Sequence, residues 1–167
     1  VGRPVAGEFS GQVTIRSDMQ EPGPADDLRI VTSDVRFNQA MITTGAAVDL
    51  RLGPHRASGK VLEVRLLTEP HAGASGSSTP ITGIDSLEIR EQVEALISTG
   101  DLDRGPGPAA PSGPLRLTSA GPFRFDFTRF IASLQDDVRA TLKNPGAEPD
   151  QLYCRELRLH LGEADGS

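Results

Sequence analysis

The sequence predicts an all-β fold, an antiparallel β-jelly roll or β-taco that is built from repeated hairpins and has roughly ten or more strands. Three observations support this prediction. Apolar and polar residues alternate with a period of two through most of the chain, turn-forming Gly and Pro residues separate the alternating runs, and helix-capping patterns are scarce. Alternation of this kind is typical of an antiparallel sheet that has one face in a dry interior and the other in water.

The first predicted strand is Phe9–Ile15, where the apolar residues share one phase. A turn at Pro22-Gly23 follows, because proline lacks the N–H group that a sheet ladder needs and glycine accepts a positive φ. In Leu28–Phe37 the apolar residues change from even to odd positions. This phase change predicts a β-bulge or a bend inside the second strand.

The next predicted strands are Met41–Thr44, which is rich in β-branched residues, and Val48–Leu52, which alternates cleanly. Gly53-Pro54 is a turn signal, and Leu62–Leu66 is expected to return along the preceding strand. These segments together predict a half-buried hairpin.

Two Gly-, Pro- and Ser-rich stretches, residues 70–80 and 103–113, are predicted to be loops. Between them, Leu87–Ser98 is ambiguous. Its Glu, Gln and Ala content favours a helix, whereas its apolar residues nearly all share one parity, which favours a strand. We interpret it as a strand, because it also takes the place of a strand in the repeat described below.

The remaining predicted strands follow the second loop and are separated by short turn signals, including Pro145-Gly146. They are Leu115–Leu117, Phe123–Phe127, Ile131–Leu134, Val138–Leu142 and Leu152–Leu161.

The chain also resembles itself. Residues 130–161 repeat the pattern of residues 8–37: an alternating strand, a Pro-Gly turn, acidic residues, and a Leu that opens a second alternating strand. Internal similarity of this kind indicates stacked supersecondary units, here β-hairpins. We therefore expect residues 1–167 to form a single domain with two similar halves, about residues 8–68 and 81–162.

Composition excludes several classes of function. The net charge of −6 and the scattered Lys and Arg residues lack the basic footprint of a nucleic-acid-binding protein, so we expect no nucleic-acid partner. The lone Cys154 allows no internal disulfide, and its place in an apolar alternation predicts a buried structural thiol. No apolar run approaches the length of about 20 residues that a membrane-spanning helix needs.

The sequence offers no catalytic or metal-binding constellation. His55 and His71 are expected in loops, His160 faces outward on its strand, and the three lack the spacing of a zinc site. The acidic pairs Asp26-Asp27 and Asp136-Asp137 are expected at the ends of strands or turns, where Asp side chains accept backbone N–H bonds. We therefore expect no enzyme activity, no metal and no cofactor.

An apolar stripe is the remaining candidate site. Phe123, Phe125, Phe127 and Phe130 hold most of the aromatic side chains of the chain. They can pack in a filled core, or they can line a groove for an aliphatic ligand, since open β folds can keep a dry concave interior.

A set of short strand and turn segments forms a further pattern: Phe9-Ser10-Gly11-Gln12-Val13-Thr14-Ile15, Asp27-Leu28, Asp150-Gln151-Leu152, Thr32-Ser33-Asp34-Val35-Arg36-Phe37, Ile42-Thr43-Thr44, Val48-Asp49-Leu50 and Ala57-Ser58-Gly59-Lys60-Val61-Leu62. This pattern resembles that of the OstA-like superfamily, which includes the lipopolysaccharide-transport proteins A and C. The resemblance implies a taco-shaped β-jelly roll in the periplasm or cell envelope, whose interior cradles the acyl chains of lipopolysaccharide or a related amphiphile.

The resemblance also implies that other OstA-like domains add strands at the open edges, which are expected in Phe9–Ile15 and Leu152–Leu161. The alternative is a structural or assembly β-module of a larger envelope protein, with a filled core and no ligand. The candidate lipid-lining residues are Val13, Ile15, Leu28, Ile30, Phe37, Val48, Leu50, Leu52, Leu62, Val64, Leu87, Ile89, Phe123, Phe125, Phe127, Val138, Leu142, Leu157 and Leu159.

Overall fold

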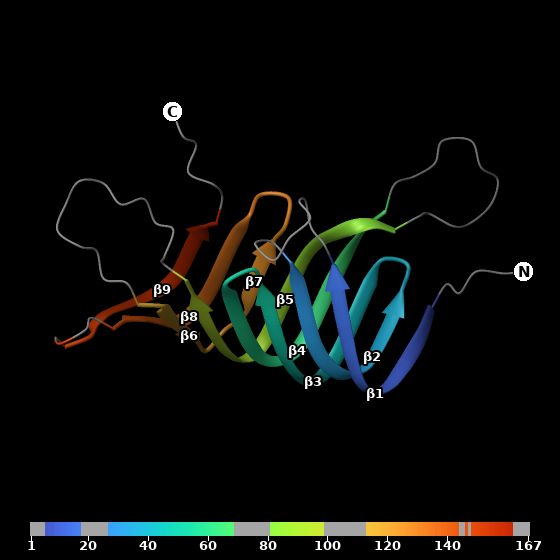
Figure 1. Cartoon of the computed structure of the whole chain (residues 1–167), viewed down its shortest axis with the longest axis horizontal. Coiled ribbons are helices and arrows are strands. Elements are labelled where there is room, and N and C mark those ends of the chain that lie inside the picture. The colour runs from blue at the N-terminus through green and yellow to red at the C-terminus, as the bar shows by residue number, and fades with distance from the viewer. Residues whose placement is uncertain are drawn as a thin grey trace, which may run out of the picture.

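The computed structural model describes residues 6–17, 27–68, 81–98, 113–143, 146 and 148–161. These residues form nine strands and no helix, which confirms the predicted all-β class. The strands, coloured from blue to red in Figure 1, are β1 (Ala6–Ser17), β2 (Leu28–Asn38), β3 (Met41–Leu52), β4 (His55–Thr68), β5 (Ile81–Ile97), β6 (Leu115–Ser119), β7 (Phe123–Asp126), β8 (Ile131–Leu142) and β9 (Asp150–His160).

All nine strands belong to one antiparallel sheet in which, apart from β6 and β7, strands that follow each other along the chain are neighbours. β6 and β7 lie end to end and share one position in the sheet, because both pair with β5 on one side and with β8 on the other. β1 ends the sheet on one side, and β9, which pairs with β8, ends it on the other. The two edge regions expected from the sequence therefore lie in the strands that form the edges.

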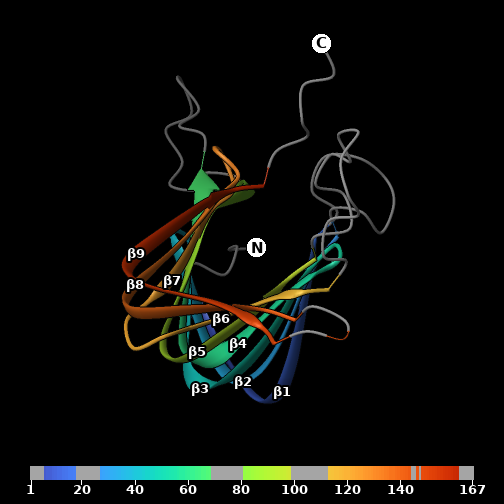
Figure 2. The ribbon, with the colours of Figure 1, turned by 90° about the vertical axis from the view of Figure 1, so that its left-hand side faces the viewer.

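A line of irregular pairings, which we call the crease, crosses the sheet near the middle of its long strands. It passes Gly11, Asp34, Val61, Gln92 and Asp136, all of which have a positive φ. The pairing register shifts along this line, and the break between β6 and β7 continues it. Figure 2 shows the sheet folded into a taco-like shape with two walls. Bulges bend strands and increase their twist, which is why the fold follows this line.

Each long strand therefore contributes one end to each wall. The first wall contains residues 6–9, 35–38, 41–44, 62–68, 81–89, 123–126, 131–134 and 157–160. The second wall contains residues 13–17, 28–32, 48–52, 55–58, 93–97, 115–119, 138–142 and 150–154.

Two glycines let the backbone close up at the crease. A Cβ atom on Gly59 would lie 2.6 Å from the carbonyl oxygen of Glu91, and one on Gly121 would lie 2.6 Å from the carbonyl oxygen of Gln135. The Gly121 N–H donates to this Gln135 oxygen at 3.0 Å. Glycine fits both places because it has no side chain to hold the neighbouring backbone away.

Bulges also explain why the described residues form nine strands rather than the ten or more that the sequence predicted. Met41–Thr44 and Val48–Leu52 are the two ends of β3, and Ile131–Leu134 and Val138–Leu142 are the two ends of β8. A bulge interrupts the alternation of side chains without ending the pairing of the strand. A break in the apolar pattern was therefore wrongly taken as the end of a strand at both places.

Two other sequence predictions are confirmed. The phase change in Leu28–Phe37 is a bulge, because the register shifts between Val31 and Arg36 and Asp34 has a φ of 51°. The ambiguous segment Leu87–Ser98 is a strand over residues 87–97, which form the C-terminal part of β5. The predicted turn at Pro22-Gly23, the loop at residues 70–80 and all but the last residue of the loop at 103–113 lie outside the described residues.

Candidate functional site

The inner faces of the two walls form the apolar interior. Pairing register places one row of inward residues across the whole first wall: Phe37, Ile42, Val64, Leu87, Phe125, Ala132 and Leu159. The matching row across the second wall is Ile15, Ile30, Leu50, Ala57, Ala95, Leu117 and Ala140. Because side chains alternate along each strand, the residues directly before and after each member of these rows point outward.

The predicted lining residues lie on these inner faces or in the core between them. Val13, Ile15, Phe37, Leu142, Leu157 and Leu159 are half-buried. The other candidates are Leu28, Ile30, Val48, Leu50, Leu52, Leu62, Val64, Leu87, Ile89, Phe123, Phe125, Phe127 and Val138, and all of them are buried. The half-buried ones all lie on the edge strands β1 and β9 or on their neighbours β2 and β8. The interior side chains are therefore more exposed toward the edges of the sheet than in its middle.

The middle of the interior is filled by side chains from both walls. Phe125 is 2% exposed and packs edge-to-face on Phe127, with ring centroids 4.6 Å apart at an angle of 71°. Phe130 packs edge-to-face on the same Phe125 ring at 6.3 Å. Phe123 is buried as well. The phenylalanine stripe therefore packs mainly on itself and on the surrounding aliphatic residues, as in an ordinary core.

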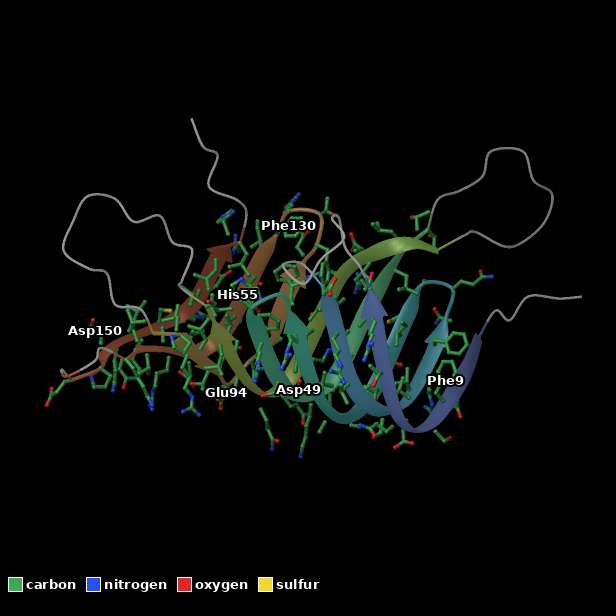
Figure 3. The ribbon with its side chains drawn as sticks, in the orientation of Figure 1. Phe9, Asp49, His55, Glu94, Phe130 and Asp150 are labelled. Carbon is green, nitrogen blue, oxygen red and sulfur yellow. The ribbon has the colours of Figure 1, made fainter. Side chains whose placement is uncertain are left out.

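The interior is open at the two edge strands instead. Phe9 on β1 is 54% exposed and Leu152 on β9 is 53% exposed. Phe9 stacks on Phe37 with ring centroids 5.2 Å apart, and Figure 3 places Phe9 at the β1 edge of the sheet. On β9, Cys154 is half-buried rather than buried as the sequence predicted. Apolar side chains are thus exposed on the two edge strands, which have no further strand beside them within the described residues.

Sequence reasoning missed several members of this interior. Val93, Leu117 and Leu134 are buried in the core but are absent from the predicted lining set. Each has the same phase of the alternation as a predicted residue on its own strand or on the strand that pairs with it. The alternation pattern could therefore have identified all three. The exposure of Phe9 and Leu152 could not be found in this way, because it depends on which strands form the edges.

The outer face of the first wall carries a network of ion pairs. Glu8 contacts Arg36 at 2.7 Å, and Arg90 contacts Glu63 at 2.8 Å and Glu88 at 2.7 Å. The hydrogen bond that Arg90 donates to Glu88, helped by the negative charges of Glu88 and Glu63, raises the pKa of Arg90 above its ordinary value.

A hollow of about 460 Å³ lies among these side chains, lined by Glu8, Phe9, Ser10, Asp34, Val35, Arg36, Thr43, Thr44, Gly45, Val61, Leu62, Glu63 and Arg90. Among its charged residues, Glu8 is paired with Arg36 and Glu63 with Arg90, while Asp34 Oδ1 accepts the Gly11 N–H at 3.0 Å.

The histidines and acidic pairs take different places from those expected. His55, predicted in a loop, is the first residue of β4, and its Nδ1 accepts the Ser98 N–H at 3.2 Å. Asp136-Asp137, predicted at the end of a strand or turn, lies inside β8 with φ values of 60° and 48°. Asp tolerates this left-handed conformation better than most residues, which suits it to a bulge. His71 and Asp26 lie outside the described residues.

Within the part of the chain that the structure describes, no group of three or more His, Cys, Asp or Glu side chains could hold a metal ion. Nor does this part include a helix with the length and apolar character of a membrane span. No protein-family model, curated protein or solved structure matches the chain. The functional argument therefore depends on geometry and on the residue patterns of the sequence.

Proposed function

We propose that this chain is a non-enzymatic lipid-binding or bridging module of the cell envelope, of the OstA-like type that carries lipopolysaccharide or a related lipid. One observation carries the proposal: the apolar interior is closed in the middle of the sheet and open at β1 and β9, the two strands at its edges. The periplasmic or envelope location rests on the resemblance of the strand patterns to OstA-like domains.

The edges supply the bridging function. An edge strand presents unpaired N–H and C=O groups that a strand of another domain can join. β1 and β9 are long strands of 12 and 11 residues, so each offers a long ladder. A neighbour that pairs with either strand would extend the sheet and the apolar interior together.

The exposed inner side chains supply the lipid contact. Phe9 and Leu152 are more than half exposed, and Ile15 and Leu157 are half-buried beside them. An acyl chain that covers these residues gains about 0.8 kcal/mol for each CH₂ group removed from water. In this proposal the lipid enters at the open edges, and no catalytic group or cofactor is needed.

Site-specific photocrosslinking tests the lipid contact. A benzophenone side chain at Phe9, Ile15 or Leu157 should crosslink to lipopolysaccharide or to a fatty-acyl probe, because these positions face the open parts of the interior. The matched controls are Thr14 and Arg158, which are exposed and lie on the outer face of the same strands. Absence of crosslinks from the inward positions, or equal crosslinks from the outward controls, contradicts lipid binding.

A second candidate is the structural or assembly module with no ligand. The filled middle of the interior favours it, since Phe125, Phe127 and their neighbours leave the core well packed. The two candidates share the edge strands and differ in the ligand. Self-association at β1 and β9 without any inward crosslink to lipid would favour the assembly module.

A further inference from the structure

The outer face of the second wall carries a row of arginines that is not visible in the sequence. Arg16 on β1 lies opposite Arg29 on β2, Arg29 lies opposite Arg51 on β3, and Arg51 lies opposite Arg56 on β4. All of these arginines are exposed. Neighbouring strands are about 4.8 Å apart, so this arginine row places a guanidinium on each of four consecutive strands along one line.

The arginine row differs from the ion-paired part of the charged surface. On and beside the first wall, several outward arginines form ion pairs with glutamates, as Arg36 does with Glu8 and Arg90 with Glu63. No residue of the arginine row forms an ion pair within the described part of the chain. Like charges directly opposite each other destabilise a sheet, so the row opposes folding rather than supporting it.

Other side chains on this part of the surface do not neutralise the row. Asp49 is the acidic residue of β1–β4 on the outer side of the second wall, and Lys60, near the crease, lies opposite Glu91 on β5. Arg116, further along the same line on β6, is paired with Glu94 at 2.9 Å. A chain with a net charge of −6 thus concentrates unpaired positive charge on one sheet face.

The shape of this face indicates the kind of anion that fits it. The arginine row stands on the open face of a sheet, and the hollows of about 460 and 510 Å³ beside the first wall are lined by none of its members. An enclosed small anion is therefore a poor match, whereas a flat array of phosphates can contact every guanidinium at once. Arginine suits phosphate because its planar fork donates paired hydrogen bonds.

Nucleic acid fits the face less well. Single-stranded nucleic acid is usually held by aromatic side chains placed among the basic ones, and β1–β4 present no aromatic residue on the outer face of the second wall.

We propose that the arginine row docks the outer face of the second wall on an anionic lipid bilayer, with the guanidinium groups on the headgroup phosphates. Basic clusters of about four to eight residues bind anionic membrane surfaces, and each residue close to the surface contributes roughly equally. The arginine row with Lys60 falls in this range. This docking does not rest on the proposed function, because it uses the outer face and leaves the interior and both edges free.

Vesicle binding tests the proposal. The whole chain is mixed with vesicles of phosphatidylcholine containing phosphatidylglycerol, or of phosphatidylcholine alone, and bound protein is measured by flotation. The chain should bind the anionic vesicles alone. The double variant Arg29→Gln/Arg51→Gln should bind them about 30-fold more weakly, because two of the contacting charges are lost. Raising the salt concentration should release the wild-type chain, since salt screens exposed charges.

The matched control is Arg65→Gln/Arg124→Gln, which removes the same charge from the outer face of the first wall. It should bind like the wild-type chain. Equal weakening of both double variants, or no binding of the wild-type chain to anionic vesicles, overturns the proposal. Binding of soluble polyphosphate without binding to vesicles also overturns it and assigns the row to a soluble polyanion. Thermal unfolding shows that each variant is folded before its binding is compared.

Discussion

At the residue scale, the fold depends on a few residues whose small size or backbone conformation lets the sheet bend. Gly59 is the clearest case, since a Cβ there would lie 2.5 Å from Cγ2 of Ile89 and 2.6 Å from the carbonyl oxygen of Glu91. Gly45 is also close to the crease, but nothing lies within 4 Å of the position of its Cβ. The two glycines therefore have different roles, although both appear as small residues inside strands.

Substitution separates these roles. Gly59→Ala should lower the free energy of unfolding by about 1–3 kcal/mol, because the added methyl group pushes against the backbone of β5. Gly45→Ala should leave stability unchanged or raise it by about 0.4–1 kcal/mol, because it reduces the freedom of the unfolded chain. Urea unfolding followed by circular dichroism measures both. If the two substitutions change the free energy of unfolding equally, the close approach of the β5 backbone to Gly59 does not determine the effect of adding a methyl group there.

At the element scale, bulges decide the path of the strands. In β2 the bulge is tied to β1, because Asp34 Oδ1 accepts the Gly11 N–H at 3.0 Å while both residues have a positive φ. This hydrogen bond joins the bulges of adjacent strands at the crease. The bend of one strand is thus coupled to the bend of its neighbour.

The coupling can be tested at Asp34. Asp34→Ala should lower the free energy of unfolding by about 1 kcal/mol, because it removes the hydrogen bond and a residue that tolerates a positive φ. Asp34→Asn should retain most of the stability, since Asn accepts the same bond and adopts the same conformation. Asp49→Ala, an exposed change on β3, is the control and should have little effect. An Asn variant as unstable as the Ala variant would argue against this role.

At the scale of the whole molecule, the taco is a sheet with a closed middle and two open ends. Its buried core runs from β2 to β8, while β1 and β9 carry apolar side chains that face inward but remain partly exposed. In the proposed bridging function, strands of neighbouring domains would complete the sheet at its ends. This is the arrangement that the bridging function needs.

Edge assembly predicts the effect of a charge on β1. Phe9→Lys should weaken self-association, or association with another β-domain, because an inward charge at an edge opposes strand addition. Ser10→Lys adds the same charge at the next residue, which is exposed, and should have a smaller effect. Sedimentation of the two variants across a range of concentrations gives the comparison. If both variants associate as the wild-type chain does, β1 is not an assembly edge.

Local alternation determined much of this protein. It was enough to predict the β class, the inward residues from Val13 to Leu159 and the bulge in Leu28–Phe37, and together with the internal repeat it predicted the strand that the structure has over residues 87–97. The direction of a side chain from a strand has a period of two, and this property is carried by neighbouring residues alone. The strand count was overestimated because a bulge and a turn break the alternation in the same way.

Tertiary structure decided the rest. The bulges of separate strands line up in one crease, Phe125 and Phe127 fill the middle of the interior, and Phe9 and Leu152 stay open at the edges. The arginine row also exists only through the pairing of β1 to β4. Register and edge position depend on contacts between residues far apart in the chain, and a shift of one residue would turn each of these side chains to the other face.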